Sequence, residues 1–152
     1  MRNLIFDIKR YAINDGPGIR STVFFKGCLL NCAWCHNPES ISPFPQKMYS
    51  HDKCIGCNTC VEACPENACE LTPQGIVTDP ELCKVCGICA DVCPTKATEI
   101  SGEVMTKEAI LEKIEKERVF FDQSGGGVTF SGGEPLMHAE FLIELLDECG
   151  ER

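Results

Sequence analysis

Basic residues are scarce in this chain of 152 residues. Lysine and arginine together number 14, against 23 aspartates and glutamates, which leaves a formal net charge of −9 at pH 7. Proteins that bind nucleic acid need clustered positive charge to neutralise phosphates, so we expect no nucleic-acid partner. Aromatic residues are also few, at 7%, and only one of them is a tryptophan. The position of that tryptophan is therefore informative.

Long apolar runs are missing as well. No window approaches the roughly 18 apolar residues that a membrane-spanning helix requires. The first segment, MRNLIFDIKRYAIND, breaks its apolar run with Asp7, Lys9 and Arg10, and no small-residue cleavage site follows. It therefore lacks the features of a secretory leader. A cysteine-rich chain without such a leader is typical of a reducing compartment, where thiols bind metal rather than pair. We expect a cytoplasmic protein with no membrane partner.

Cysteine, by contrast, is abundant, and most of the 13 cysteines form a repeat. The run CIGCNTCVEACP begins at Cys54 and the run CKVCGICADVCP at Cys83. Every cysteine of the first run has a counterpart in the second at the same offset along the chain, as Pro65 has in Pro94. The spacing C-x2-C-x2-C-x3-C-P resembles the run of a bacterial two-cluster ferredoxin. In such a run three thiolates on a tight loop bind one four-iron cluster, and the helix that follows carries the fourth cysteine to the other cluster.

The ferredoxin resemblance assigns these cysteines to two four-iron clusters. One cluster takes Cys54, Cys57, Cys60 and Cys93, and the other takes Cys83, Cys86, Cys89 and Cys64. The alternatives are buried free thiols or zinc sites, although zinc sites usually alternate C-x2-C pairs with long gaps. Residues 75–79 and 96–101 are expected to close the two halves as short strands.

A second group of cysteines has only three members. Cys28, Cys32 and Cys35 follow the spacing C-x3-C-x2-C, and no fourth cysteine before a proline completes the group. Three thiolates leave one iron of a four-iron cluster without a protein ligand. This arrangement parallels the open position of catalytic zinc sites. A structural zinc site or a set of buried thiols is the alternative interpretation.

The triplet resembles the signature of radical S-adenosylmethionine (SAM) enzymes. The resemblance implies that SAM binds the open iron of a third four-iron cluster. One electron would then cleave SAM to methionine and a 5′-deoxyadenosyl radical, so that the cofactor rather than a catalytic side chain carries the radical chemistry. The resemblance also places Trp34 against the adenine of SAM. Cys35, His36 and Asn37 would frame the same site.

A glycine-rich segment supports this resemblance. The stretch GGGVTFSGGEP, residues 125–135, predicts a strand at 128–130 followed by a glycine turn. In radical SAM enzymes a similar turn binds the amino group of SAM, which implies this role for Gly132, Gly133 and Glu134. Glycine permits the close backbone approach that such a contact needs.

The segment upstream of the triplet narrows the resemblance further. YAINDGPGIRSTVFFKGC predicts a turn at NDGPG and then a β-rich strand that delivers the cysteine loop. Together with CHNPES, it resembles the N-terminal signature of glycyl-radical-enzyme activating enzymes, of the type with a ferredoxin insert. The resemblance implies that a backbone glycine of a partner glycyl radical enzyme loses a hydrogen atom. It also implies a low-potential electron donor such as flavodoxin or ferredoxin.

The same resemblance suggests a mouth for the partner's glycine loop. Asp15, Gly16, Pro17 and Arg20 would shape this mouth. The alternative is an ordinary turn with a solvated arginine.

The remaining chain predicts two amphipathic helices. One is expected over 106–121 with Thr106 as N-cap and an inward stripe of Ile110, Leu111 and Ile114. The other is expected over 138–150, with Phe141, Leu142, Leu145 and Leu146 facing inward. Cys69 and Cys149 fit no metal spacing and are expected to be buried, unligated thiols. His51 and His138 are expected to be surface or packing residues.

The order of these elements predicts an α/β fold. It resembles the N-terminal part of a partial (β/α)6 TIM-like radical SAM barrel with an inserted α+β two-cluster ferredoxin-like domain. The expected parts are 1–50, 51–100 and 101–152. About two of six βα units are present, so we expect a C-terminally truncated chain. Two other functions remain open, namely a polyferredoxin electron carrier without catalysis and a radical SAM enzyme that acts on a small molecule.

Overall fold

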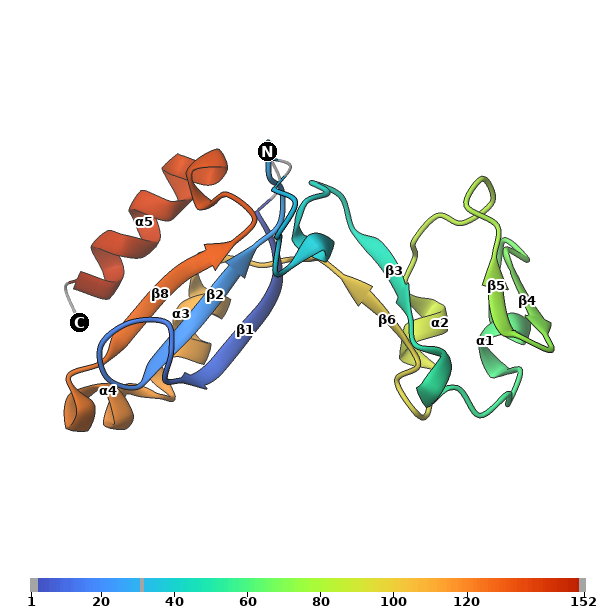
Figure 1. The fold of residues 1–152 in the computed structure, drawn as a ribbon, viewed down its shortest axis with the longest axis horizontal. Coiled ribbons are helices and arrows are strands. Elements are labelled where there is room, and N and C mark those ends of the chain that lie inside the picture. Colours follow the sequence, from blue (N-terminus) through green and yellow to red (C-terminus); the bar gives the residue numbers. More distant parts are fainter. Residues whose placement is uncertain (1–2, 31, 151–152) are drawn as a thin grey trace. The chain divides into compact units, whose positions relative to one another are not determined.

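The protein folds into two compact units in the computed structural model, which describes residues 3–30 and 32–150. One unit comprises Met1–Phe44 and Gly102–Arg152, and the other is Pro45–Ser101 (Figure 1). Each unit has a hydrophobic core of its own. Within the described ranges, no helix has both the length and the apolar character needed to cross a membrane.

The larger unit is built on a four-stranded sheet in the order β7-β1-β2-β8. Its strands are β7 (Glu103–Val104), β1 (Leu4–Ala12), β2 (Arg20–Phe25) and β8 (Gly127–Gly132). β1 is antiparallel to both β2 and β7, whereas β8 is parallel to β2. β2 therefore lies between two strands, and its Val23 and Phe25 side chains are fully buried.

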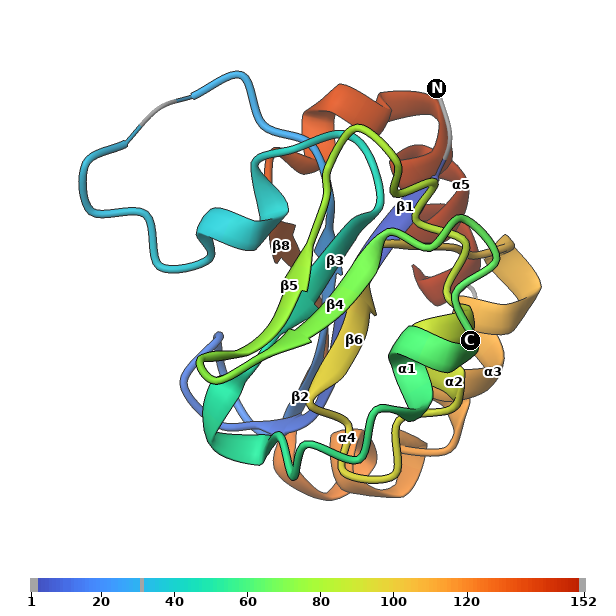
Figure 2. The same ribbon diagram turned by 90° about the vertical axis from the view of Figure 1, so that its right-hand side faces the viewer.

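Two helices cover one face of this sheet. α3 (Lys107–Glu115) and α5 (Ala139–Gly150) contribute the buried residues Ile110, Leu111, Ile114, Phe141, Leu142 and Leu145 to the core against β1 and β2 (Figure 2). The Ala109 N–H donates to Thr106 Oγ1 at 3.2 Å, which confirms the predicted N-cap. Leu146 was predicted to face inward, but it is 51% exposed.

The helix predicted over 106–121 is divided in two. α3 ends at Glu115, and α4 (Arg118–Ser124) begins after Glu117. The Glu117 side chain turns inward, where Arg10 on β1 donates from Nε to Oε1 at 2.6 Å. The periodic pattern was wrong about a single helix because this contact joins residues far apart in the sequence.

The sheet also differs from the opening of a parallel barrel. β1 and β2 are joined only by residues 13–19, and a parallel pair needs a crossover of about a dozen residues or more, so they pair antiparallel. Among the described strands only β2 and β8, with the smaller unit and α3–α4 between them in sequence, form a parallel pair. The fold is thus mixed α/β, and the described residues form no closed barrel.

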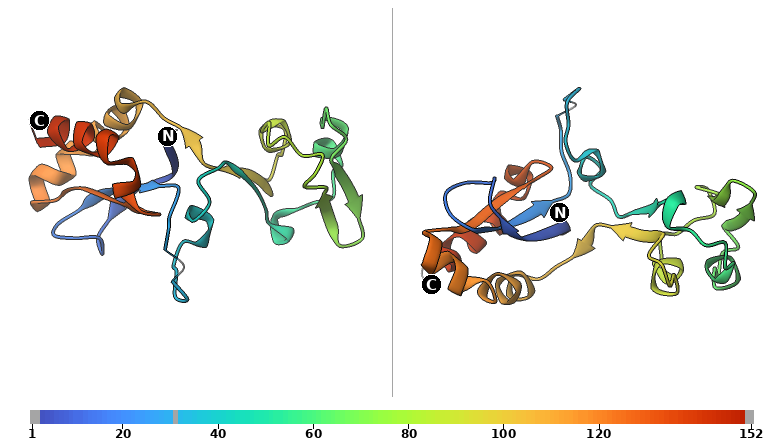
Figure 3. Two further views of the ribbon diagram at one scale, coloured as in Figure 1. Left: turned by 90° about the horizontal axis from the view of Figure 1, so that it is seen from above. Right: turned by 60° about the horizontal axis from the view of Figure 1, so that its bottom comes forward.

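The smaller unit has an internal repeat in its structure as well as in its cysteines. β3 (Gln46–Tyr49) pairs with β6 (Thr98–Ser101), and β4 (Cys69–Thr72) pairs with β5 (Gly75–Thr78). The short helices are α1 (Thr59–Glu62) and α2 (Ile88–Asp91), and a 3-10 turn spans His51–Lys53 (Figure 3). The offset between the two cysteine runs also maps β3 onto β5, β4 onto β6 and α1 onto α2. The two strands predicted at 75–79 and 96–101 are confirmed as β5 and β6.

Candidate functional site

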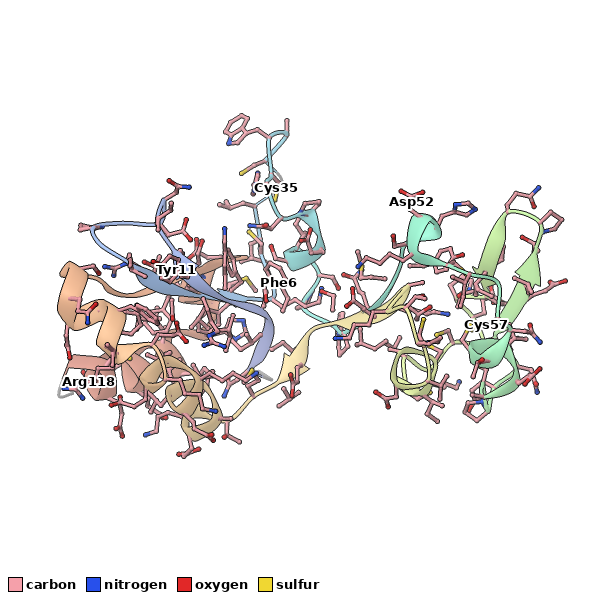
Figure 4. The ribbon with its side chains drawn as sticks, turned by 90° about the horizontal axis from the view of Figure 1, so that it is seen from below. Phe6, Tyr11, Cys35, Asp52, Cys57 and Arg118 are labelled. Carbon is pink, nitrogen blue, oxygen red and sulfur yellow. The ribbon has the colours of Figure 1, made fainter. Side chains whose placement is uncertain are left out.

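The three-cysteine loop directly follows the carboxyl end of β2. Cys28, Cys32 and Cys35 are all free thiols of intermediate burial. Figure 4 shows Cys35 on a loop that extends away from the sheet of its unit. The Leu30 N–H donates to Cys28 Sγ at 3.4 Å. The thiolate is the form of cysteine that binds metal.

Backbone hydrogen bonds close the base of this loop. The Gly27 N–H donates to the Ser40 carbonyl oxygen at 2.7 Å, and the Cys28 N–H donates to the Ile41 carbonyl oxygen at 3.0 Å. A 3-10 turn, Pro38–Ser40, lies on the far side of the loop. The two ends of the cysteine loop are therefore held together beside the end of β2.

Two buried polar side chains flank this base, Lys26, to which the sequence gave no role, and His138, which was expected to be a surface or packing residue. Lys26 is fully buried and donates through Nζ to the Glu39 carbonyl oxygen. Burial lowers the pKa of Lys26, although the Glu39 carboxylate partly offsets this effect. His138 is a buried packing residue, with Nε2 2.9 Å from the Lys26 carbonyl oxygen and its ring 5.3 Å from that of Phe25. A lysine directly after the apolar strand VFF is the signal that could have identified Lys26.

The glycine turn lies directly against the base of the cysteine loop. The Gly133 N–H donates to the Phe25 carbonyl oxygen and the Glu134 N–H to the Gly27 carbonyl oxygen, both at 2.8 Å. Because β8 is parallel to β2, the segments after both strands meet at the same edge of the sheet. The structure thus places the predicted Gly132–Glu134 turn beside the base of the loop that carries the triplet. The Glu134 side chain accepts from the Leu136 N–H at 3.0 Å and caps the 3-10 turn Pro135–His138.

The two glycines of this turn have no room for a side chain. Gly132 has φ +102°, and a Cβ there would lie 2.5 Å from the Phe25 carbonyl oxygen. A Cβ on Gly133 would lie 2.2 Å from the Gly27 carbonyl oxygen. Only glycine permits such a close approach of two backbones.

The other predicted SAM contacts lie on the cysteine loop itself. Trp34 is 85% exposed, and His36 is also exposed. Their contacts with the adenine and the rest of SAM stay predictions.

The predicted mouth residues lie at the opposite ends of the strands. Arg20 donates from Nε to Thr129 Oγ1 at 2.6 Å and from Nη2 to the Val128 carbonyl oxygen at 2.5 Å. Asp15 Oδ2 accepts from Thr22 Oγ1 at 2.6 Å. Arg20 is therefore not a solvated arginine, because it also donates from Nη1 to the Pro17 carbonyl oxygen at 3.2 Å and so joins the loop of residues 13–19 to β8. The loop, drawn in blue, lies beside α4 in Figure 1.

These mouth residues also face away from the helical core. Val23 belongs to the core beneath α3 and α5, and side chains alternate along a strand, so Thr22 points to the opposite face. Asp15 contacts Thr22 there, at the start of β2, whereas the cysteine loop begins after its end. The structure does not bring Asp15, Gly16 and Arg20 together with the triplet. Their role as a mouth stays a prediction.

In the smaller unit, one predicted ligand set lines a single cavity. Cys64, Cys83, Cys86 and Cys89 all border one small cavity that is partly open to solvent. Burial acts to raise the pKa of Cys64, but the Ala68 and Glu66 N–H groups outweigh it and hold that pKa below its ordinary value. Burial raises the pKa of Cys89. Metal binding would therefore have to displace a proton from Cys89.

The other ligand set shows the same kinds of contact. Thr59 Oγ1 donates to the exposed Cys57 Sγ at 3.4 Å, and this bond and one from the Thr59 N–H lower the pKa of Cys57. Negative charge on Cys93 acts to raise the pKa of Cys57, so the Cys57 and Cys93 thiols interact electrostatically. Cys54 and Cys60 pack in the core of this unit.

The two cysteines outside the predicted ligand sets, and His51, only partly match the packing or surface roles that the sequence predicted. Cys69 is buried, as predicted, but it accepts a hydrogen bond from Lys47, which no spacing suggested. Cys149 is only partly buried and packs against the core of the larger unit. His51 is a surface residue.

Comparison with known proteins assigns this chain to a family. The family model described as "4Fe-4S single cluster domain" matches residues 14–152. The chain belongs to this family. The matched range includes the triplet, the repeat and the glycine turn.

Curated relatives are activating enzymes, which confirms the resemblance found in DGPGIR and CHNPES. The chain is 42% identical to the indoleacetate decarboxylase activating enzyme of Tractidigestivibacter scatoligenes, over 100% of this chain and 51% of that protein. It is 41% identical to the trans-4-hydroxy-L-proline dehydratase activating enzyme of Clostridioides difficile, over 98% and 50%. It is 43% identical to the (2S)-3-sulfopropanediol dehydratase activating enzyme of Klebsiella oxytoca, over 96% and 48%. The chain spans about half the length of these relatives.

The cysteine ligands available in this chain fit iron–sulfur clusters. The 13 cysteines are thiols rather than halves of disulfides, and thiolates are the ligands of such clusters. N–H and O–H groups donate to the sulfurs of Cys28, Cys57 and Cys64, as is expected of groups that tune a cluster. In the described part of the chain, no three His, Cys, Asp or Glu side chains lie close enough to hold a single metal ion. The fit thus rests on the shared cavity and these hydrogen bonds.

Replacing Gly133 with alanine is expected to disrupt the turn beside the cysteine loop. The new Cβ would meet the Gly27 carbonyl oxygen at 2.2 Å, so one backbone must shift, at a cost of about 3 kcal/mol or more in unfolding free energy. Chemical denaturation measures this loss. Gly150→Ala is the matched control, because no atom lies within 4 Å of the added Cβ. Equal stability of the two variants would contradict the tight contact.

Proposed function

We propose that this protein is a radical SAM activating enzyme for a glycyl radical enzyme. The main observation in support is a pair of hydrogen bonds. They join the Gly132–Glu134 turn to Phe25 and Gly27, which directly precede the three-cysteine loop. A cofactor held by that loop would lie within reach of the turn. Family membership and the named relatives support the same conclusion.

The roles of the residues follow from this arrangement. Cys28, Cys32 and Cys35 would bind three irons of one four-iron cluster and leave the fourth iron for SAM. When bound, the cluster would supply one electron to cleave SAM, and the resulting 5′-deoxyadenosyl radical would abstract hydrogen from a glycine of the partner enzyme. Gly133 would leave room for the SAM amino group, and Trp34 would stack on the adenine.

The smaller unit would hold two further four-iron clusters that relay electrons. Cys57 and Cys86 are exposed, so each cluster would have an edge near solvent that a donor protein can approach. A flavodoxin or ferredoxin of low potential would be the donor.

Anaerobic incubation with SAM, a reductant and candidate glycyl radical enzymes tests this function. We expect the glycyl doublet in electron paramagnetic resonance (EPR) with the correct partner, and none with a partner whose radical-bearing glycine is replaced by alanine. SAM cleavage without any glycyl doublet would favour a small-molecule substrate. If SAM leaves every cluster signal unchanged and iron amounts to about eight atoms per chain, the protein is a polyferredoxin carrier instead.

A further inference from the structure

The two halves of the smaller unit are not equivalent in charge. The first half contains β3, α1 and β4, and the second contains β5, α2 and β6. When the halves are aligned by their cysteine runs, Lys47 on β3 is equivalent to Ile76 on β5. The same alignment pairs Cys69 on β4 with Thr98 on β6. One half therefore places an ammonium group where the other places a hydrocarbon side chain.

Lys47 is fixed beside one cysteine set, although its charge also acts to lower the pKa of Cys60 in the other set. Its Nζ donates to Thr78 Oγ1 at 2.7 Å and to Cys69 Sγ at 3.0 Å. It also lines the cavity of Cys64, Cys83, Cys86 and Cys89. Burial acts to lower the pKa of Lys47, but the Cys69 hydrogen bond and the nearby thiols outweigh it and raise that pKa, so the group carries its charge at neutral pH.

The other cysteine set has neutral groups at the equivalent positions. Ile76 is buried in the core with Cys54 and Cys60. Tyr49, the counterpart of Thr78, accepts from the Ile76 N–H at 3.0 Å. A tyrosine hydroxyl has an ordinary pKa of about 10, so this group is neutral at pH 7.

We infer that Lys47 makes the cluster of Cys64, Cys83, Cys86 and Cys89 the more easily reduced of the two ferredoxin-type clusters. Reduction adds one negative charge to a cluster, and a nearby ammonium group stabilises that charge. Two other charged residues line the cavity, Lys84 and Glu66, but both are exposed, so solvent and salt screen them. The inference rests on the cluster assignment of the proposed function.

The difference in potential would give the relay a direction. An electron equilibrated within the unit would reside mainly on the cluster beside Lys47. The cluster of Cys54, Cys57, Cys60 and Cys93 would be reduced only at lower potential. Lys47 is thus a positioning residue for charge and needs no contact with SAM or with the partner enzyme.

Redox titration of the anaerobically reconstituted protein, followed by EPR, tests this inference. In Lys47→Gln we expect one of the two ferredoxin-type potentials to fall by at least the equivalent of a tenfold change in the ratio of reduced to oxidised cluster, which is about 59 mV. The other potential should fall by much less, because Lys47 lines the cavity of the first set and reaches the other set only through Cys60. Lys47→Arg keeps the charge and should keep the wild-type potential. The affected signal should be the one that Cys86→Ser removes.

Two further variants separate this effect from surface charge. Lys84→Gln removes the exposed cavity charge, and Lys53→Gln removes a charge that pairs with Glu99 on the surface. Both should shift the potential by much less than Lys47→Gln. Unchanged potentials in Lys47→Gln with all three clusters present would overturn this inference alone. A wild-type protein without the two ferredoxin-type clusters would overturn the proposed cluster assignment together with it.

Discussion

Replacing Cys35 with alanine is expected to remove one cluster of three and every spectral response to SAM. Two thiolates cannot hold the cluster that leaves one iron open, so bound iron should fall from about twelve to about eight atoms per chain. SAM cleavage to methionine should fall by at least about a thousandfold, which corresponds to about 4 kcal/mol in the activation barrier. Iron analysis, EPR with and without SAM, and quantitation of methionine measure these three effects.

Cys149→Ala is the matched control for this variant. Cys149 is a partly buried cysteine outside every predicted ligand set, and it packs against the core formed by α3 and α5. Its loss should leave both the iron content and the SAM response unchanged. A SAM response that survives in Cys35→Ala would rule out the triplet as the SAM site. Zinc bound tightly by the wild-type triplet, with no iron, would favour the structural-zinc interpretation.

The sequence predicted best those features that repeat or that lie close together in the chain. The offset between the two cysteine runs recurs in the strands and helices of the smaller unit, because both runs carry the same local strand and helix signals, although the pairs β3–β6 and β4–β5 each join one half to the other. The Thr106 cap is likewise local, since its hydroxyl accepts from the N–H of the nearby Ala109. Such features can be recognised from residues that lie close together in the sequence.

Contacts between distant segments account for the features that sequence missed. The antiparallel pairing of β1 with β2 is the exception, because it follows from the short loop of residues 13–19 between two consecutive strands. Arg10 drew Glu117 inward and divided the predicted helix. Arg20 carried no local sign that it would bind Thr129 and Val128 on β8.

The same reasoning applies within the candidate site. The glycine turn and the triplet were each found by motif, and the parallel pairing of β2 with β8 places the turn beside the base of the cysteine loop. Lys26 lies in the stretch before the triplet and Lys47 in no motif. Neither was given a role, since their partners Glu39 and Cys69 lie on other segments of the chain. A side chain whose role depends on such a neighbour becomes visible only when the fold is known.

A double replacement, Cys57→Ala with Cys86→Ala, is expected to disable the relay while sparing the triplet. Each change removes one exposed ligand from one ferredoxin-type set. With a flavodoxin or ferredoxin as donor, SAM cleavage should slow by at least about tenfold, because electrons would have to reach the triplet cluster directly. With dithionite, a small reductant that can approach the exposed triplet loop itself, cleavage should continue at close to the wild-type rate. Product formation with each donor measures the difference.

The comparison between the two donors makes this result specific. A folding defect would reduce cleavage with both donors, whereas loss of the relay reduces it only with the protein donor. Single replacements sharpen the assignment, since each should remove about four iron atoms per chain. Unchanged cleavage by the double variant with the protein donor would show that the eight cysteines of the repeat do not carry electrons to the triplet.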